Sequence, residues 1–295
     1  MKKALFVVNP HSGKGAIRGK LLDIFDILTR NDYFTSVHIT QYAGDGYSTV
    51  KNRAMEFDVV IASGGDGTLN EVIRGVMELP PPARPKIGYL PSGTVNDFAS
   101  NLKIPKNPLK ACHAFVQGND FCCDVGKFNH RSFVYVAAFG ALTNVPYETP
   151  QQNKNALGHL AYFLEGIKQL YAIPSFKLSA EFDFEHIQGE FMLGMVSNSN
   201  YIAGFKTVKA QKAQLNDGLF EVMLIKKPGT LAELSEIIAQ INDDNIKTDA
   251  IRIFRTSKVS FVFEEPAQWT LDGEFGGAVK TADITVEKEA VTLII

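Results

Sequence analysis

Four short apolar runs, each followed by a stretch with helical spacing, occupy the first hundred residues of the chain. They cover 4–8, 37–39, 59–62 and 87–90, and the second alternates with polar residues. A continuous apolar run of this length is typical of a strand buried on both faces of a sheet. Strands that alternate with helices form parallel sheets through right-handed crossovers. The pattern therefore predicts an N-terminal doubly wound α/β domain.

The second half of the sequence has a different pattern. Residues 176–184 alternate strictly between apolar and polar side chains, which predicts a half-buried antiparallel strand. Further strands are predicted at 133–136, 191–196, 219–225, 259–263, 269–271, 284–286 and 291–295, with helices at 157–171 and 231–241. We expect an α/β domain over 1–122, completed by 288–295, and an antiparallel β-sandwich over 123–287. A chain of 295 residues suits two domains of ~150 residues each.

Charge and composition exclude several classes of protein. The 30 Lys and Arg residues against 32 Asp and Glu residues leave a net charge of −2, which removes the electrostatic argument for a nucleic-acid binder. No apolar run reaches the ~18 residues of a membrane helix, so no transmembrane segment is predicted and a lipid would be reached from the membrane surface. The three cysteines form no C-x-x-C pair, which favours a reducing, cytoplasmic compartment.

Conspicuous glycine-containing loops follow three of the four N-terminal strands, at the sheet edge where ligands bind in doubly wound folds. The first loop reads Asn-Pro-His-Ser-Gly-Lys-Gly over 9–15. It is not a Walker A loop, because Gly15 rather than a hydroxyl residue follows Lys14. A phosphate-facing turn and an ordinary turn between strand and helix are equally compatible with this loop.

The second loop, Ser-Gly-Gly-Asp-Gly-Thr-Leu-Asn-Glu over 63–71, holds three glycines in four residues. Glycines let backbone N–H groups approach a polyphosphate, and a helix beginning near Leu69 would add its positive end. Asp66 would repel phosphate unless Mg²⁺ lay between them. The loop therefore predicts a metal-nucleotide site.

The third loop, Pro-Ser-Gly-Thr-Val-Asn-Asp-Phe-Ala over 91–99, repeats the combination of Gly, Thr and an acidic residue before a short helix. Simple N-terminal capping by Asn96 and Asp97 is the alternative. Together, the second and third loops resemble the catalytic domain of the diacylglycerol kinase superfamily. The second loop is shared with NAD kinases and, loosely, with phosphofructokinases, whereas the third is more specific to lipid kinases. Similar family pieces occur at 123–126, 216–219 and 271–274.

The resemblance implies an ATP site, a catalytic Mg²⁺ held by Asp66 and Asp97, and a fold like that of NAD kinase and phosphofructokinase. The residues implied in ATP binding are Asn9, Pro10, His11, Ser12, Gly13, Thr40, Gly64, Gly65, Asp66, Gly67, Thr68, Leu69, Asn70, Thr94, Asn96 and Asp97.

Two turns in the second half gain roles from the same resemblance. Glu274 is implied as the general base that removes the proton of the lipid hydroxyl, and Asp272 as part of the Mg²⁺-linked network, although the two roles can be exchanged. The alternative is a simple Asp-Gly hairpin turn. Gln214, Asp217 and Leu219 are implied as ligands of a second, structural Mg²⁺, with an Asp-Gly turn as the alternative.

The implied reaction is phosphorylation of diacylglycerol by ATP and Mg²⁺ to give phosphatidic acid. Another lipid acceptor, such as a sphingoid base, ceramide or a polyprenol, is the main alternative. An NAD kinase or a non-catalytic nucleotide or lipid sensor is less compatible with the motifs. We expect a cytoplasmic protein that associates peripherally with the inner face of the membrane, and a homodimer is left open.

Overall fold

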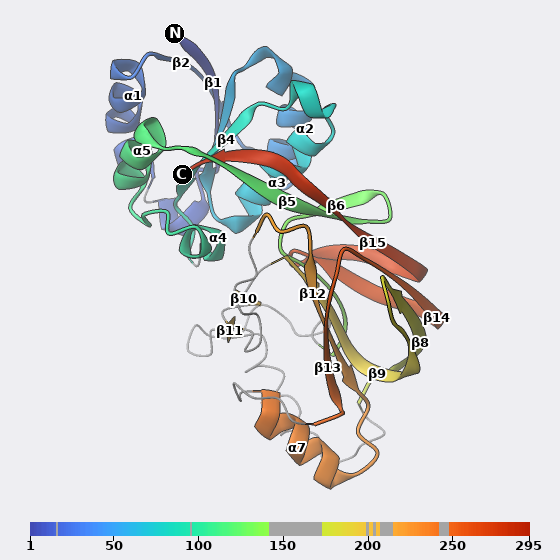
Figure 1. The fold of residues 1–295 in the computed structure, drawn as a ribbon. Helices are drawn as coiled ribbons and strands as arrows, with labels where there is room; N and C mark the ends of the chain where they lie inside the picture. The colour runs from blue at the N-terminus through green and yellow to red at the C-terminus, as the bar shows by residue number, and fades with distance from the viewer. Residues whose placement is uncertain are drawn as a thin grey trace. The chain divides into compact units, whose positions relative to one another are not determined.

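The computed structural model describes residues 1–141 except Ala16 and Val95, and residues 173–198, 201–202, 205–206, 215–241 and 248–295. The predicted helix over 157–171 and Gln214 lie outside the described residues. The chain divides into two compact units, one of Met1–Asp124 with Lys288–Ile295 and one of Val125–Glu287 (Figure 1). Two strands, β5 (Asp120–Phe128) and β15 (Glu274–Ile294), run from one unit into the other.

The first unit contains a parallel sheet. Its strands are β1 (Lys2–Val8), β2 (Tyr33–Ile39), β3 (Val59–Gly64) and β4 (Lys86–Pro91). They lie in the order β2-β1-β3-β4, and the end of β15 runs parallel to β4 with Leu293 opposite Ile87. Because β2 and β3 lie on opposite sides of β1, the sheet has a topological switch point between β1 and β3. The predicted doubly wound fold is confirmed.

Helices cover both faces of this sheet. They are α1 (Leu21–Arg30), α2 (Asp45–Arg53), α3 (Asp66–Met77), α4 (Asp97–Asn101) and α5 (Pro108–Gln117). Helix α1 packs against α5, and α2 packs against α3, so that the two pairs lie on opposite sides of the strands (Figure 1). The predicted apolar face of α3 is confirmed, because Leu69, Val72, Ile73 and Val76 are all buried.

The start of α3 differs from the prediction. The helix begins at Asp66 rather than near Leu69, because Gly65 takes an extended conformation and its carbonyl accepts the N–H of Leu69 at 3.2 Å. The apolar periodicity starts only at Leu69, since the first turn consists of Asp66, Gly67 and Thr68. These three residues therefore belong to the helix N-terminus itself, where the free N–H groups and the positive end of the dipole lie.

The second unit is built mainly from antiparallel strands. Beside the ends of β5 and β15 they are β6 (Arg131–Phe133), β7 (Val136–Gly140), β8 (Phe176–Phe182), β9 (His186–Ser197), β12 (Phe220–Lys226), β13 (Ile251–Thr256) and β14 (Lys258–Leu271), with the short pair β10 (Tyr201–Ile202) and β11 (Phe205–Lys206). The main order is β13-β12-β9-β7-β14-β15, and β8 pairs with β9 and β14. Helix α7 (Leu231–Ile241) confirms the predicted helix there.

Aromatic side chains form the core of this unit. The Trp269 ring lies 4.9 Å from the rings of both Phe128 and Phe139, and all three side chains are buried. Strand β13 was not predicted, because Arg252 and Arg255 interrupt its short apolar run. The strands predicted at 259–263 and 269–271 are one strand, β14, with a bulge between Val262 and Ala267. In the same way, 284–286 and 291–295 both belong to β15.

Candidate active site

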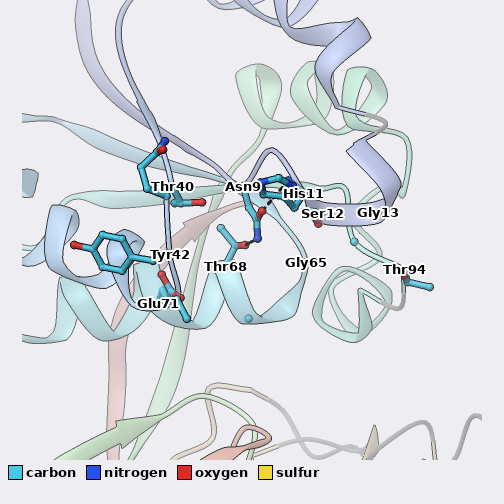
Figure 2. A pocket seen from close by; sticks show the side chains of 14 residues that line it. Asn9, His11, Ser12, Gly13, Thr40, Tyr42, Gly65, Thr68, Glu71 and Thr94 are labelled. Atoms are coloured by element: carbon cyan, nitrogen blue, oxygen red, sulfur yellow. Dashed lines mark hydrogen bonds between the residues drawn. The ribbon is translucent and has the colours of Figure 1, made fainter. Parts of the chain in front are cut away.

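A cavity of about 500 Å³ opens where the three N-terminal loops meet, at the carboxyl ends of β1 and β3 (Figure 2). Its lining consists of Asn9, His11, Ser12, Gly13, Thr40, Gln41, Tyr42, Ala43, Gly65, Gly67, Thr68, Glu71, Gly93 and Thr94. Ligands of doubly wound proteins bind at the switch point of the sheet, which is where this cavity lies. Seven residues of the first two loops that were predicted to bind the nucleotide therefore line one cavity together with Thr40 and Thr94.

The three loops pack so closely that only glycine fits at their contacts. Gly13 has φ +54, and a Cβ atom there would overlap the carbonyl oxygen of Ser92 in the third loop. A Cβ atom on Gly93 would lie 2.5 Å from the Cα atom of Gly65 in the second loop. The glycines therefore allow three backbone segments to surround one cavity.

Asn9 connects the first loop to the second. Its Nδ2 atom donates to Oγ1 of Thr68 at 3.4 Å, and its Oδ1 atom accepts the backbone N–H of His11 at 3.0 Å. Figure 2 shows the Asn9 and Thr68 side chains pointing toward one another. This side chain therefore fixes both the turn at His11 and the first turn of α3.

Asp66 connects the second loop to the third. Its Oδ1 atom accepts the backbone N–H of Phe98, in the first turn of α4, at 3.2 Å. The Asp66 carboxylate thus bridges the N-termini of two helices, where negative charge is stabilised. The side chain of Asp97 lies outside the described residues.

The capping alternative for Asn96 is wrong. Its side chain makes no cap hydrogen bond to α4 and instead turns back to the third loop. Oδ1 of Asn96 accepts the N–H of Gly93 at 3.0 Å and the hydroxyl of Tyr89 at 3.3 Å, while Nδ2 donates to the Gly93 carbonyl at 2.8 Å. Asn96 is in the left-handed region with φ 55, which Asn tolerates better than most residues. It holds the loop around Gly93 in shape.

Two acidic residues that the sequence analysis did not select shape the other end of the cavity. Glu71 of α3 accepts the N–H of Gly44 at 2.8 Å through Oε1, and Asp45 accepts the N–H of Gln41 at 2.8 Å. Burial alone would raise the pKa of Asp45, but the Gln41 N–H and the His38 ring together hold it below its usual value. Both carboxylates thus fix the segment that carries Tyr42. Glu71 could have been selected from the sequence, because it stands three residues after Thr68 and residues at this spacing lie on the same face of a helix.

The turn between β14 and β15 has the predicted hairpin geometry. Asp272 and Gly273 have φ values of 50 and 87, and Leu271 pairs with Glu274, as in a two-residue type I′ turn. The Asp272 carboxylate accepts three backbone N–H groups, from Val134 and Tyr135 at 2.7 Å and from Val136 at 2.9 Å. These bonds pin residues 134–136 to the turn. Glu274 is the exposed first residue of β15.

The turn before β12 contains the two described residues of the predicted structural metal site. Asp217 accepts the N–H of Leu219 at 3.0 Å through Oδ1, which is the geometry of an Asx turn. Its Oδ2 atom accepts a hydrogen bond from Nη2 of Arg255 at 2.7 Å. Within the described part of the chain, no group of three or more His, Cys, Asp or Glu side chains is placed to hold a metal ion.

The fold and the glycine loops define a class of kinases in which an α/β domain with a Gly-Gly-Asp-Gly-Thr loop is combined with a β-rich domain. Comparison with known families agrees. Residues 3–128 match the diacylglycerol kinase catalytic domain, and residues 138–295 match the YegS C-terminal NAD kinase beta sandwich-like domain. The chain belongs to the diacylglycerol kinase family and is a lipid kinase by that membership.

Individual relatives match over nearly the whole chain. A diacylglycerol kinase from Bacillus subtilis is 37% identical over 280 residues, covering 94% of this chain and 91% of its own. A diacylglycerol kinase from Staphylococcus aureus is 36% identical over 290 residues, with 97% and 90% covered. A crystal structure of a diacylglycerol kinase from Bacillus anthracis shares the fold, with a TM-score of 0.77 at 22% identity and 99% and 96% coverage. No helix among the described residues is long and apolar enough to cross a membrane.

Proposed function

We propose that this chain transfers the γ-phosphoryl group of ATP to the hydroxyl of diacylglycerol, giving ADP and phosphatidic acid. The observation that carries the proposal is the cavity formed by three glycine loops at the switch point of the sheet. Relatives with 36–37% identity that are named diacylglycerol kinases support the choice of acceptor.

The loops of the first unit bind the ATP phosphates in this proposal. Among the described residues that line the cavity there is no Lys or Arg, and in this proposal backbone N–H groups and the N-terminus of α3 recognise the phosphates. The proposed nucleotide contacts are the predicted residues that line the cavity, namely Asn9, His11, Ser12, Gly13, Thr40, Gly65, Gly67, Thr68 and Thr94. Leu69 faces the core of the unit instead. Tyr42 and Glu71 line the end of the cavity opposite Thr94; Figure 2 shows them on the left and Thr94 on the right.

Asp66 and Asp97 would hold Mg²⁺ in the proposed site. Asp66 is compatible with this role, because its sequence neighbours Gly65 and Gly67 both line the cavity and the Phe98 N–H fixes its carboxylate. Mg²⁺ is commonly bound by one or two carboxylates together with substrate phosphates. When bound, the ion supplies charge neutralisation at the transferred phosphoryl group. Without it, Asp66 would repel ATP.

Glu274 is the proposed general base. The three N–H donors already use most of the acceptor capacity of Asp272, whereas Glu274 is exposed at the start of its strand. We therefore infer that Asp272 positions the turn and that Glu274 accepts the proton of the lipid hydroxyl. The second unit then serves as the acceptor domain, and the enzyme works in the cytoplasm at the membrane surface.

The acceptor is tested with γ-labelled ATP and a panel of compounds in mixed micelles. The panel contains diacylglycerol, ceramide, a sphingoid base, a polyprenol and NAD. We expect label in diacylglycerol at a rate at least tenfold above that for every other acceptor. Faster labelling of another lipid would transfer the proposal to that lipid, and labelling of NAD alone would overturn it.

A further inference from the structure

Three charged side chains meet at the turn that precedes β12. Asp217 lies in the turn, Glu221 lies on β12, and Arg255 lies on β13 directly opposite Glu221 in the antiparallel register. Residues that are directly opposite in such a pair project to the same face of the sheet. Accordingly, Nη2 of Arg255 lies 2.7 Å from Oδ2 of Asp217, and Nε of Arg255 lies 3.3 Å from Oε1 of Glu221.

The arginine is the charge partner of a buried acid. Glu221 is 4% exposed, and neither of its carboxylate oxygens accepts a hydrogen bond within the described residues. The single positive charge of the Arg255 guanidinium lies beside both acids and offsets one of their two negative charges. Its planar fork of five N–H donors reaches two carboxylates in different directions, which a lysine ammonium at the end of a flexible chain does less well.

These contacts do not fit the structural Mg²⁺ that the family resemblance predicts at this turn. A bound Mg²⁺ would lie ~2.1 Å from a carboxylate oxygen of Asp217. The oxygen Oδ2 already lies 2.7 Å from the Arg255 guanidinium, and Oδ1 already accepts the N–H of Leu219. A divalent ion on the same carboxylate would be strongly repelled by the adjacent guanidinium.

We propose that the Arg255 guanidinium takes the place of the structural metal ion in this chain. It offsets one of the two negative charges of Asp217 and Glu221 and ties the turn at 215–219 to β13. The stability of the second unit is then independent of Mg²⁺, whereas the phosphoryl transfer proposed above still requires it. The proposal concerns Mg²⁺ binding by the nucleotide-free chain, so its outcome is separate from the outcome of the acceptor assay.

The test uses the full chain without nucleotide, in the Asp66→Asn background, which removes one of the two proposed catalytic Mg²⁺ ligands. Thermal unfolding is recorded in MgCl₂ and in EDTA at equal ionic strength, and Mg²⁺ binding is measured directly by titration calorimetry. Arg255→Ala is compared with Arg252→Ala, a matched control on the same strand whose guanidinium lies 3.7 Å from a Glu185 carboxylate oxygen. Arg255→Gln removes the charge while keeping a long polar side chain, and it serves if Arg255→Ala fails to fold.

With Arg255 present, we expect no Mg²⁺ binding at this turn and the same Tm in both buffers. Arg255→Ala should unfold several degrees below Arg252→Ala in EDTA and regain stability in MgCl₂, and a further Asp217→Asn change should abolish that recovery. If only Arg255→Gln folds, it should show the same loss in EDTA and the same recovery in MgCl₂. Mg²⁺ binding that requires Asp217 in the presence of Arg255 would overturn the proposal. An Arg255 variant that does not respond to Mg²⁺ would also overturn it.

Discussion

The backbone N–H of Phe98 donates to Oδ1 of Asp66 at 3.2 Å, and this bond joins the two most specific glycine loops of the chain. The acid that would repel a phosphate is thus held by the first turn of the neighbouring helix α4. Because an amide oxygen can accept the same N–H, the structural and the electrostatic roles of Asp66 can be separated by substitution.

Asp66→Asn should keep the fold and lose catalysis. The amide still accepts the Phe98 N–H but carries no charge for Mg²⁺, so we expect the transfer rate to fall by a factor on the order of 10² or more. Asp66→Ala should in addition lower the free energy of unfolding by about 1 kcal/mol, because the Phe98 N–H loses its acceptor. Initial rates and chemical denaturation of both variants check this. Near-normal activity of Asp66→Asn would contradict the proposed metal role.

Gly13→Ala should disrupt the cavity. A Cβ atom there overlaps the Ser92 carbonyl, and φ +54 is unfavourable for alanine, so we expect a loss of about 2 kcal/mol in stability and much weaker ATP binding. Gly19→Ala is the matched control, since a Cβ atom at Gly19 meets nothing within 4 Å. Nucleotide titration and denaturation of the two variants provide the comparison. Equal ATP affinity in both would show that the contact between the first and third loops is dispensable.

Asp45 gives a pH-dependent prediction. Its folded pKa lies below the ordinary value of 3.8, so its contribution to stability is present above that value and is lost as pH falls through the folded pKa. Asp45→Asn should therefore be less stable than the parent chain at neutral pH, and the difference should shrink as the pH falls below 3.8. Asp26→Asn, which removes only an exposed ion pair with Arg30, should change stability little at any pH. Denaturant midpoints of the parent chain and both variants, measured across this pH range, test this prediction.

Asp272 and Glu274 should respond differently to substitution. Asp272→Ala leaves three backbone N–H groups without their acceptor, so we expect a loss of about 2 kcal/mol or more in stability along with the loss of activity. Glu274→Gln should keep the unfolding free energy of the parent chain and lower kcat while leaving KM for ATP nearly unchanged. If Glu274→Gln retained near-full kcat, Glu274 would not be the base.

The sequence predicted the elements that carry strong periodicity. The buried face of α3 and the parallel sheet followed directly from apolar spacing, because burial on one face repeats with the period of the element. The first turn of α3 could not be placed, because its residues are not apolar and so do not continue the periodic pattern of the buried face. Strand β13 was missed for a similar reason, because Arg255 occupies a partly exposed position in it.

The sequence predicted which loops form the candidate site better than it predicted what each residue does there. The glycine motifs identified the loops, and Glu71 stands at the end of the second motif but was not selected. Tyr42 comes from a segment with no motif and reaches the cavity through the pairing of β1 with β2. The three bonds from residues 134–136 to Asp272 join positions more than 130 residues apart, and no local pattern reveals them.

The proposed reaction requires that the cavity bind ATP and that this chain pass the γ-phosphoryl group to diacylglycerol. The most direct measurement is the initial rate at which label from γ-labelled ATP enters phosphatidic acid in diacylglycerol micelles, for the parent chain, Gly19→Ala and Glu274→Gln. The account predicts comparable Mg²⁺-dependent labelling by the first two, abolished by EDTA, and a loss on the order of 10² or more for Glu274→Gln. No labelling of diacylglycerol by the folded parent chain with ATP and Mg²⁺, or unchanged labelling in EDTA, would contradict it.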